Sequence, residues 1–289
     1  MNFGNKFKSG IKFRFLCIIP AMNTNKPLNL DGASRVHFIV GDPIAQVKSP
    51  AGVSQAFQDA GLNALCVPAH VAPADLAAWT AGVSLSKNVD GIIVTVPHKF
   101  AYFDLCATTS ERGAFLKSIN TLRRNADGSW HGDMFDGMGY VKALALKGCQ
   151  LQGQKALLVG AGGAGSAIAY SLATGGVREL AIHDEDTVRR DALVQRLASL
   201  GLCTVVAGSS DPTGFDIAIN ATPIGMKAGD PHPIDSSKFT PAMFVGCVIT
   251  APAVPPMIEA ARALGCHTLT GADMFAQVKD LMVNFLMGQ

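Results

Sequence analysis

The feature that most constrains the fold is residues 155–165, with the sequence KALLVGAGGAG. A short apolar run with a strand-like pattern opens here into a cluster of glycines. Gly160, Gly162 and Gly165 have the G-x-G-x-x-G spacing that lets a strand turn tightly, lets the backbone approach a pyrophosphate and lets the next helix pack on the sheet. The sequence therefore predicts a strand, a phosphate-binding turn and a helix, in that order.

The segments after these glycines fit a dinucleotide-binding unit. Residues 166–174 predict a helix that stops at Gly175, and its N-terminal N–H groups would face the phosphates. Residues 179–184 are a second apolar run, which ends in Asp184 where a ribose hydroxyl would lie. Together these segments favour dinucleotide binding over a purely structural glycine turn.

Composition limits the class of protein. A length of 289 residues, of which 48% are hydrophobic, suggests about two domains with sizeable cores. The net charge of +2 gives no reason to expect nucleic acid or an anionic membrane as a partner. Seven scattered cysteines without a C-x-x-C pair are interpreted as reduced core residues, which predicts a cytoplasmic protein.

The N-terminus carries no acidic side chain before Asp31, and its basic residues precede a short apolar patch at 15–22. This could be a signal or transit segment, but Pro20 interrupts the patch and no clear cleavage site follows. We therefore favour a disordered tail over residues 1–31, or an overlong start with Met22 as the initiator. Residues 240–258 are uncharged, but their prolines exclude a membrane-spanning helix.

The chain before the glycines alternates strands and helices. Strands are predicted at 35–41, 62–71 and 90–96, and helices at 51–60, 73–82, 102–106 and 140–146. Residues 118–124 and 129–133 flank an Asp-Gly turn signal and predict a hairpin. These elements predict an α/β domain with a largely parallel sheet, whose ligands lie beyond the carboxyl ends of the strands.

The second half predicts a doubly wound sheet and a closing helix. Its strands are expected at 155–160, 179–184, 203–208, 215–220, 244–249 and 267–271. The closing helix, residues 273–286, has an apolar face that could pack back on the first domain. We expect a cofactor to contact Gly160, Gly162, Gly163, Ala164, Gly165, Asp184, Asn220, Thr222, Pro223, Gly225 and Met226.

Two ionisable side chains lie near the predicted crevice. Lys99 follows the third strand, and Asp136 lies at the domain junction. Such a pair suggests oxidation of an alcohol, in which a base takes the hydroxyl proton while the carbinol hydrogen leaves as hydride to a nicotinamide. From spacing alone, however, the favoured interpretation is a solvated lysine at a helix start and a turn or N-cap aspartate.

The chain resembles the shikimate/quinate dehydrogenase family over about residues 35–289. The motifs that carry this resemblance, in the family's order, are GDPIAQVKSP, VTVPHK, SINTL, GDMFDG, LLVGAGGAG, INATPIGM and TGADMFAQ. The resemblance implies two α/β domains. A catalytic, substrate-binding domain would comprise residues 32–136 and 272–289, and a Rossmann NAD-binding domain would comprise residues 137–271.

The resemblance also implies roles for individual residues. Lys99 would be the base, and Asp136 would bind the reacting diol and assist movement of the proton. A small cyclic hydroxy acid would be bound by Ser49, Thr95, Asn120 and Gln277. Gln277 is as readily explained as a polar residue on the exposed side of its helix, because its spacing from Met274 is one residue shorter than in the family.

Four polar positions of the family pattern are apolar here. Val47 stands in place of the first serine of an S-x-S pair, Ile93 in place of an asparagine, and Met134 and Phe135 in place of Asn-Thr. A missing polar contact to a substrate hydroxyl costs about 1–3 kcal/mol. We therefore expect shikimate to be a poorer substrate than a less polar or differently substituted hydroxy acid.

The turn after the second Rossmann strand also departs from the pattern of NADP-using relatives. A basic residue is usual there, whereas this turn reads HDED at 183–186. An acid repels a 2′-phosphate and accepts hydrogen bonds from a free ribose, so we predict NAD over NADP. Arg189 and Arg190 could fold back towards a phosphate, although a solvated helix face is favoured.

The histidines give no sign of a metal site. His98 is expected to point away from Lys99. No metal is proposed, because ligand-like spacing with Cys, Asp or Glu is lacking at His70, His131, His232 and His267.

The predicted enzyme has two rivals. One is a non-catalytic NAD or metabolite sensor with the same fold, although the presence of both Lys99 and Asp136 argues against it. The second is a dehydrogenase of a different small hydroxy acid or an aminated analogue, which the four apolar replacements favour. The chain could be a monomer or a homodimer.

Overall fold

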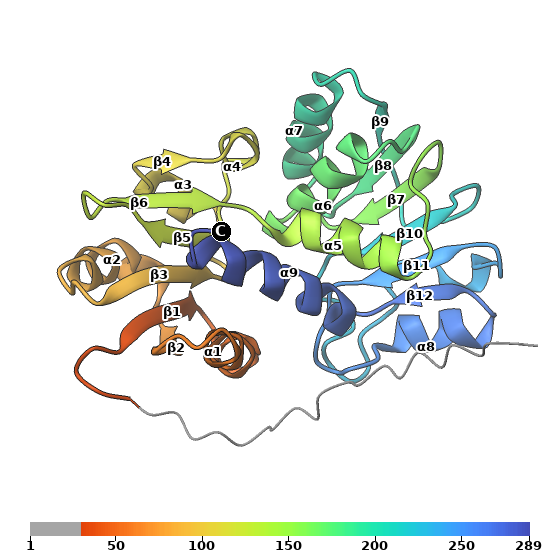
Figure 1. The fold of residues 1–289 in the computed structure, drawn as a ribbon. Coiled ribbons are helices and arrows are strands. Elements are labelled where there is room, and N and C mark those ends of the chain that lie inside the picture. Colours follow the sequence, from red (N-terminus) through yellow and green to blue (C-terminus); the bar gives the residue numbers. More distant parts are fainter. Residues whose placement is uncertain (1–29) are drawn as a thin grey trace, which may run out of the picture.

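The apolar runs of the sequence form the strands of two separate sheets, which two long helices connect (Figure 1). The structure is a computed structural model and describes residues 30–289. Nearly all of the predicted N-terminal tail, with Cys17 and Met22, therefore lies outside the described residues. The α/β class and the two-sheet organisation agree with the sequence prediction.

The first sheet is mixed, with the order β2-β1-β3-β5-β6-β4. Its strands are β1 (Arg35–Gly41), β2 (Ala64–His70), β3 (Val89–Val94), β4 (Thr108–Thr109), β5 (Thr121–Arg124) and β6 (Trp130–Asp133). β1 pairs in parallel with β2 and β3, whereas β5 and β6 form the expected antiparallel hairpin. Pro68 is tolerated because β2 is an edge strand.

Helices flank this sheet. They are α1 (Ser49–Asp59), α2 (Leu76–Ser84), α3 (Ala101–Leu105) and α4 (Glu111–Leu116), with a 3₁₀ turn at Pro73–Asp75. α4 and the short β4 were not predicted. α4 nevertheless has a local start signal, because the Ser110 side chain accepts a hydrogen bond from the backbone N–H of Gly113.

The second sheet is parallel throughout, with the order β12-β11-β10-β7-β8-β9. Its strands are β7 (Lys155–Val159), β8 (Glu179–His183), β9 (Thr204–Ala207), β10 (Ile217–Asn220), β11 (Phe244–Cys247) and β12 (His267–Leu269). The helices around it are α6 (Gly163–Thr174), α7 (Thr187–Ala198) and α8 (Pro256–Ala263). The strand order reverses between β7 and β10, the switch point where doubly wound sheets bind ligands.

Two helices connect the halves. α5 (Asp136–Leu146) runs from the first sheet to the second, and α9 (Gly271–Leu286) returns beside it in the opposite direction (Figure 1). α5 begins at Asp136, earlier than predicted. The close packing of these helices needs Gly139, because a Cβ there would lie 2.3 Å from a methyl of Val278. α9 reaches the first sheet, as the sequence predicted, and the boundaries at residues 136 and 272 stay predictions.

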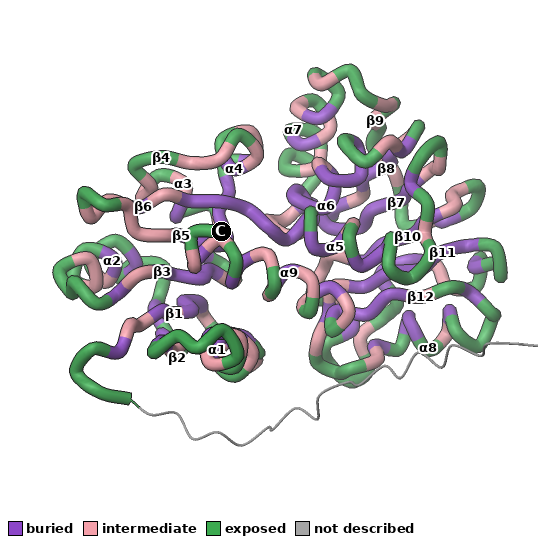
Figure 2. Tube along the Cα trace, in the orientation of Figure 1, coloured by how far each residue is buried: buried purple, intermediate pink, exposed green. Residues whose placement is uncertain are grey.

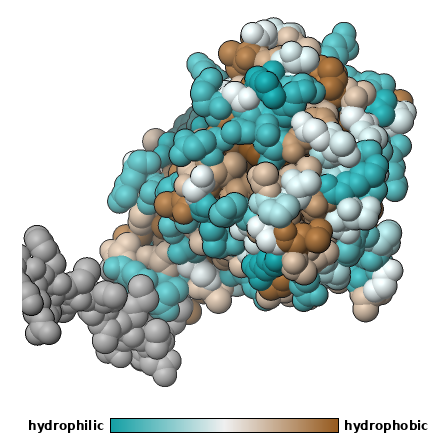
Figure 3. Space-filling model, turned by 90° about the vertical axis from the view of Figure 1, so that its right-hand side faces the viewer, coloured by the Kyte–Doolittle hydropathy of each residue, from teal (hydrophilic) through white to brown (hydrophobic). Residues whose placement is uncertain are grey.

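The cores follow the strands. Figure 2 shows burial along both sheets and along α6, whereas the outer turns are exposed. Figure 3 shows one face of the molecule, on which polar side chains dominate and apolar ones are scattered. The helices of residues 30–289 include none with both the length and the apolar character needed to cross a membrane. Among residues 30–289, Cys66, Cys247 and Cys266 are buried free thiols, whereas the free thiols of Cys106, Cys149 and Cys203 are only partly buried.

Candidate active site

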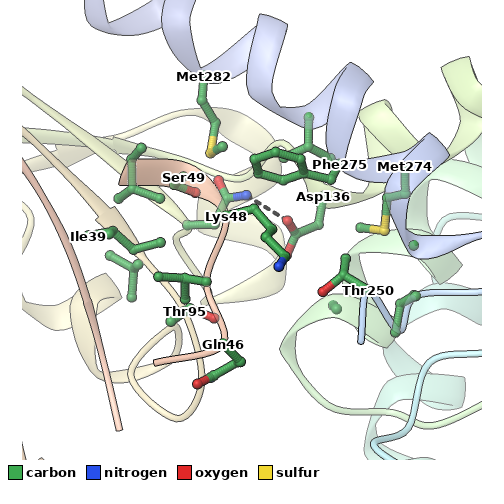
Figure 4. Close-up of a pocket in the computed structure, with 18 of the residues that line it drawn as sticks. Ile39, Gln46, Lys48, Ser49, Thr95, Asp136, Thr250, Met274, Phe275 and Met282 are labelled. Atoms are coloured by element: carbon green, nitrogen blue, oxygen red, sulfur yellow. Dashed lines mark hydrogen bonds between the residues drawn. The ribbon is translucent and has the colours of Figure 1, made fainter. Parts of the chain in front are cut away.

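A cavity of about 220 Å³ lies where the first sheet, α9 and loops of the second half meet (Figure 4). Parallel strands end together at one edge of a sheet, and β1 and β3 therefore bring the segments that follow them to this place. The lining residues fall into three groups. Those of the first sheet and its loops are Ile39, Gln46, Val47, Lys48, Ser49, Ile93, Val94, Thr95, Lys99 and Asn120. Asp136, Gly271, Met274, Phe275, Val278 and Met282 come from α5 and α9, and Ala164, Val248 and Thr250 from the second half.

Lys99 and Asp136 form an ion pair on the wall of this cavity. Nζ of Lys99 donates a hydrogen bond to Oδ2 of Asp136, and their side chains are only 13% and 8% exposed. Oδ1 of Asp136 accepts a second hydrogen bond, of 2.8 Å, from the Asn120 amide. A solvated lysine and an isolated turn aspartate, the interpretation that spacing alone favoured, do not describe this geometry.

The Asn120 amide has a fixed orientation. Its Oδ1 accepts hydrogen bonds from the backbone N–H of Phe135 at 3.0 Å and from the Thr121 hydroxyl at 3.1 Å. One N–H of the amide donates to Asp136, which leaves the second as a donor for a ligand. Asn120 thus connects the β5–β6 hairpin to the first residue of α5.

The predicted substrate residues do not all reach the cavity. Ser49 and Thr95 line it, as does Asn120, but Gln277 does not. α9 advances about 100° per residue, so the position facing the cavity is occupied by Val278 instead. The shortened spacing from Met274 was the sequence signal for this difference.

Several lining residues were missed by sequence reasoning. Gln46 and Lys48 belong to the loop after β1, and Thr250 follows β11 at the carboxyl edge of the second sheet. The strand-end rule that located Lys99 could also have located Thr250. Phe275 and Met282 could not be identified as lining residues, because an apolar helix face predicts packing but does not show which of its residues face a cavity.

Two of the four apolar replacements bear directly on the cavity. Val47 and Ile93 line it, whereas Met134 and Phe135 are buried outside the lining. The Phe135 ring lies 5.2 Å from the ring of Phe285. Phe135 therefore packs against α9, whereas Met134 packs with Leu116 and Ala167, and neither replacement removes a polar group from the lining itself.

The glycine loop has the geometry that its spacing predicts. Gly160 has φ of +108°, and a Cβ there would lie 2.8 Å from the carbonyl carbon of Ala221 in the loop after β10. A Cβ on Gly165 would lie 1.9 Å from the carbonyl oxygen of Gly160, whereas one on Gly162 would meet nothing within 4 Å. Gly160 and Gly165 are thus required by the fold, and Gly162 leaves open space in front of α6.

The start of α6 lies beside Lys99 and the cavity. A Cβ on Gly163 would lie 3.2 Å from Cδ of Lys99, and Ala164 lines the cavity. α6 begins at Gly163, three residues before the predicted start, because Gly162 adopts the extended conformation of an N-cap. The predicted phosphate site and the lysine therefore lie side by side.

The loop after β10 is organised by Asn220. Its Oδ1 accepts hydrogen bonds from the backbone N–H and the hydroxyl of Thr222, at 2.9 and 2.7 Å, and its amide donates to the Ile224 carbonyl. Asn220 is buried, so the structure places it as a support for the loop. Gly225 is also buried, and within residues 220–226 the exposed residues are Pro223 and Met226.

The Asp184 side chain is held in place by hydrogen bonds from the protein itself. Its carboxylate accepts hydrogen bonds from the backbone N–H of Ala161 at 2.6 Å and of Asp186 at 2.9 Å, and from Arg189 at 2.7 Å. Burial alone would raise the pKa of Asp184, but these hydrogen bonds outweigh it and the pKa lies below its ordinary value. Arg189 therefore folds onto this acid, and Arg190 pairs with Asp191.

His98 is structural, as expected. It is buried, and its Nε2 lies 2.8 Å from the carbonyl oxygen of Val71. Within residues 30–289, no group of three or more His, Cys, Asp or Glu side chains could hold a metal ion.

Comparisons with known proteins give consistent matches. A family model described as the shikimate dehydrogenase substrate binding domain matches residues 39–122, and a ThiF family model matches residues 143–197. A shikimate dehydrogenase (NADP(+)) of Rubrobacter xylanophilus is 32% identical over 247 residues, which cover 84% of this chain and 87% of that protein.

Two further similar proteins carry different enzyme names. A quinate/shikimate dehydrogenase (NAD(+)) of Corynebacterium efficiens is 36% identical over 196 residues, 65% of this chain and 69% of that protein. The solved structure of a ligand-free 5-ketofructose reductase of Gluconobacter sp. strain CHM43 has a TM-score of 0.79 and 27% identity. That comparison covers 89% of this chain and 94% of the reductase.

Proposed function

We propose that this chain, which belongs to the shikimate/quinate dehydrogenase family, is an NAD-dependent dehydrogenase. It would oxidise a ring hydroxyl of shikimate, quinate or a related cyclic hydroxy acid. The observation that carries this proposal is the buried Lys99–Asp136 pair on a cavity wall that also touches the start of α6. A merely structural surface pair would not be expected to line a cavity in this way.

The residues of the pair have distinct parts in the reaction. In the oxidation direction, Lys99 first releases to solvent the proton that it donates to Asp136, and its neutral amine then accepts the proton of the reacting hydroxyl. Asp136 and the free N–H of Asn120 hold the neighbouring hydroxyl and so orient the ring. The carbinol hydrogen leaves as hydride, for which bound NAD(P) supplies the acceptor.

The residues around the glycine loop fit a dinucleotide. The open space at Gly162, together with the N-terminal N–H groups of α6, suits a pyrophosphate. Oδ2 of Asp184 accepts one protein hydrogen bond in the described residues, from Ala161, and retains an acceptor position for a ribose hydroxyl. Arg189 compensates the charge of Asp184, but Glu185 and Asp186 leave the turn with a net negative charge, which supports NAD over NADP because it would repel a 2′-phosphate.

The first experiment measures NADH formation at about 340 nm with shikimate or quinate. Lys99→Ala is expected to lower kcat by about 10²–10⁴-fold, the usual contribution of a positioned general base. Thermal stabilisation by NAD should persist in the variant, which controls for folding. Retention of turnover by Lys99→Ala would contradict the assigned base. Stabilisation by NAD without turnover of any hydroxy acid would instead favour a sensor.

The cofactor preference has its own test. We expect kcat/KM with NAD to exceed that with NADP, and Asp184→Ala to narrow the difference. Glu185→Ala is the matched control, because Glu185 is the exposed neighbour in the same turn. The preference for NAD is wrong if the unmodified protein uses NADP as well as NAD. A cytoplasmic location and a monomeric or homodimeric state remain proposals, the former supported by the free thiols.

A further inference from the structure

The cavity has two walls of different chemistry. The four α9 side chains that line it, Met274, Phe275, Val278 and Met282, are all apolar. Figure 4 shows Met274, Phe275 and Met282 projecting from α9, with Thr95 on the opposite side of the cavity. Ile39, Val47 and Ile93 extend the apolar surface from the first sheet and its loop.

The polar groups are gathered elsewhere in the cavity. Lys99, Asp136 and Asn120 form one hydrogen-bonded group, which ends at the reacting position. The other polar residues of the lining belong to loops outside α9 or to the start of α1, and they are Gln46, Ser49, Thr95 and Thr250. No α9 side chain among the described residues extends this network into the cavity, because Gln277 lies outside the lining. A ring bound here would find hydrogen-bonding partners on the catalytic side and hydrocarbon on the α9 side.

The cavity also carries a net positive charge. Its charged residues are Lys48, Lys99 and Asp136, and the last two compensate one another. Lys48 is exposed, precedes the first residue of α1 and forms no ion pair within the described residues. The N-terminus of α1 and the Ser49 hydroxyl add to its attraction for an anion.

We infer, building on the proposed function, that the preferred substrate is a ring carboxylate with fewer hydroxyls than shikimate. It keeps the reacting hydroxyl and one vicinal neighbour for Lys99, Asp136 and Asn120. Its carboxylate lies near Lys48 and Ser49, and its remaining ring edge carries no hydroxyl where it faces α9. A hydroxyl on that edge would lose its water without gaining a partner, which disfavours more hydroxylated acids.

The test uses a matched pair of substrates, shikimate and an analogue that retains the reacting hydroxyl and its vicinal neighbour but lacks the third hydroxyl. We expect kcat/KM with NAD to be at least about tenfold higher for the analogue, the lower range for one unpaired buried hydroxyl. Equal or better turnover of shikimate would overturn the inference and leave the proposed function standing. Absence of turnover with every ring acid would overturn the proposed function, and the inference with it.

Three variants locate the effect on α9. Val278→Gln places a hydrogen-bonding side chain on the cavity wall and should shift the preference towards shikimate by about tenfold. Met282→Gln makes the same test if the packing of Val278 against Gly139 does not tolerate the change. Gln277→Val should leave the preference unchanged. A selective loss of shikimate turnover in Gln277→Val would show that Gln277 binds the substrate and would overturn the inference.

Lys48→Met tests the carboxylate position. We expect it to raise KM for the ring acid by about tenfold or more while kcat changes little, and to leave KM for the corresponding uncharged amide unaltered. An unchanged KM for the acid would show that the carboxylate does not lie near Lys48 and would overturn that part of the inference. Thermal stabilisation by NAD serves as the readout that Lys48→Met is folded.

Discussion

The two sides of the crevice are built by different means. On the cofactor side, the loop after β7 depends on missing side chains, since Cβ atoms at Gly160 or Gly165 would collide with backbone atoms. On the substrate side, side chains from separate elements must converge, as Lys99 and Asp136 do. Backbone geometry leaves a fixed spacing in the sequence, whereas convergence of side chains depends on the whole fold.

The largest expected effect on the free energy of unfolding is that of a substitution at Gly165, on the cofactor side. Gly165→Ala should lower the free energy of unfolding by about 3 kcal/mol or more, because the new methyl would meet the Gly160 carbonyl at 1.9 Å. Gly162→Ala should leave stability almost unchanged and raise KM for NAD, because only a bound pyrophosphate would meet its methyl. Urea unfolding and initial rates separate the two effects.

Equal stability losses in the two variants would contradict the division between a fold glycine and a cofactor glycine. An unchanged KM for NAD in Gly162→Ala would place the pyrophosphate elsewhere. Together, these results would show that the cofactor side does not depend on missing side chains in the glycine loop.

A second prediction concerns titration within the first sheet, outside the cavity lining. Burial lowers the pKa of His37, on β1, to about 4, whereas an unfolded histidine titrates near 6.5. The unfolded chain therefore binds the proton first as the pH falls. The contribution of neutral His37 to the free energy of unfolding is fully present above about pH 6.5 and is lost towards pH 4. The loss is about 2 kcal/mol between pH 7.5 and pH 5.

Urea unfolding at both pH values measures this loss, and His37→Leu should reduce it. The variant keeps a side chain that can pack beside Phe57, whose ring lies 4.5 Å from His37. An unchanged pH dependence in His37→Leu would assign the loss to other groups.

The smallest expected effect is at Tyr140, in the α5 connection. Its hydroxyl is buried without a hydrogen-bond partner among the described residues, and burial raises its pKa well above the ordinary value. Tyr140→Phe should raise the free energy of unfolding by about 1 kcal/mol, because it removes an unpaired polar group. Both sides of the crevice should keep their KM values. A loss of stability instead would show that the hydroxyl has a partner, such as a bound water.

The sequence predicted the parts of this site that follow from local rules. The glycine spacing, the doubly wound sheet and the carboxyl-end position of Lys99 were all readable from short segments. The contact of Lys99 with Asp136, 37 residues away, was expected only through the family resemblance, because spacing alone favoured independent roles. The register of α9 decides between Gln277 and Val278, and one residue of uncertainty was enough to exchange a polar group for an apolar one.

The hydrogen bonds of Asp184 show a similar limit. Its position at the end of β8 was predictable, but its contact with the N–H of Ala161 joins residues 23 positions apart. The same carboxylate therefore has a structural task that no ribose-binding pattern reveals. A polar residue at a binding site often both supports a loop and contacts a ligand. The structure of the chain without its ligand shows only the support of the loop.

The double crossing of the chain between its halves has a mechanical consequence. α5 and α9 run in opposite directions and are packed together at Gly139 and Val278. A single connection would allow the halves to twist as well as to open, whereas twisting about two adjacent helices would break this packing. The two helices thus fix the orientation of one half against the other. They hold the glycine loop beside Lys99, where a Cβ on Gly163 would lie 3.2 Å from the lysine Cδ.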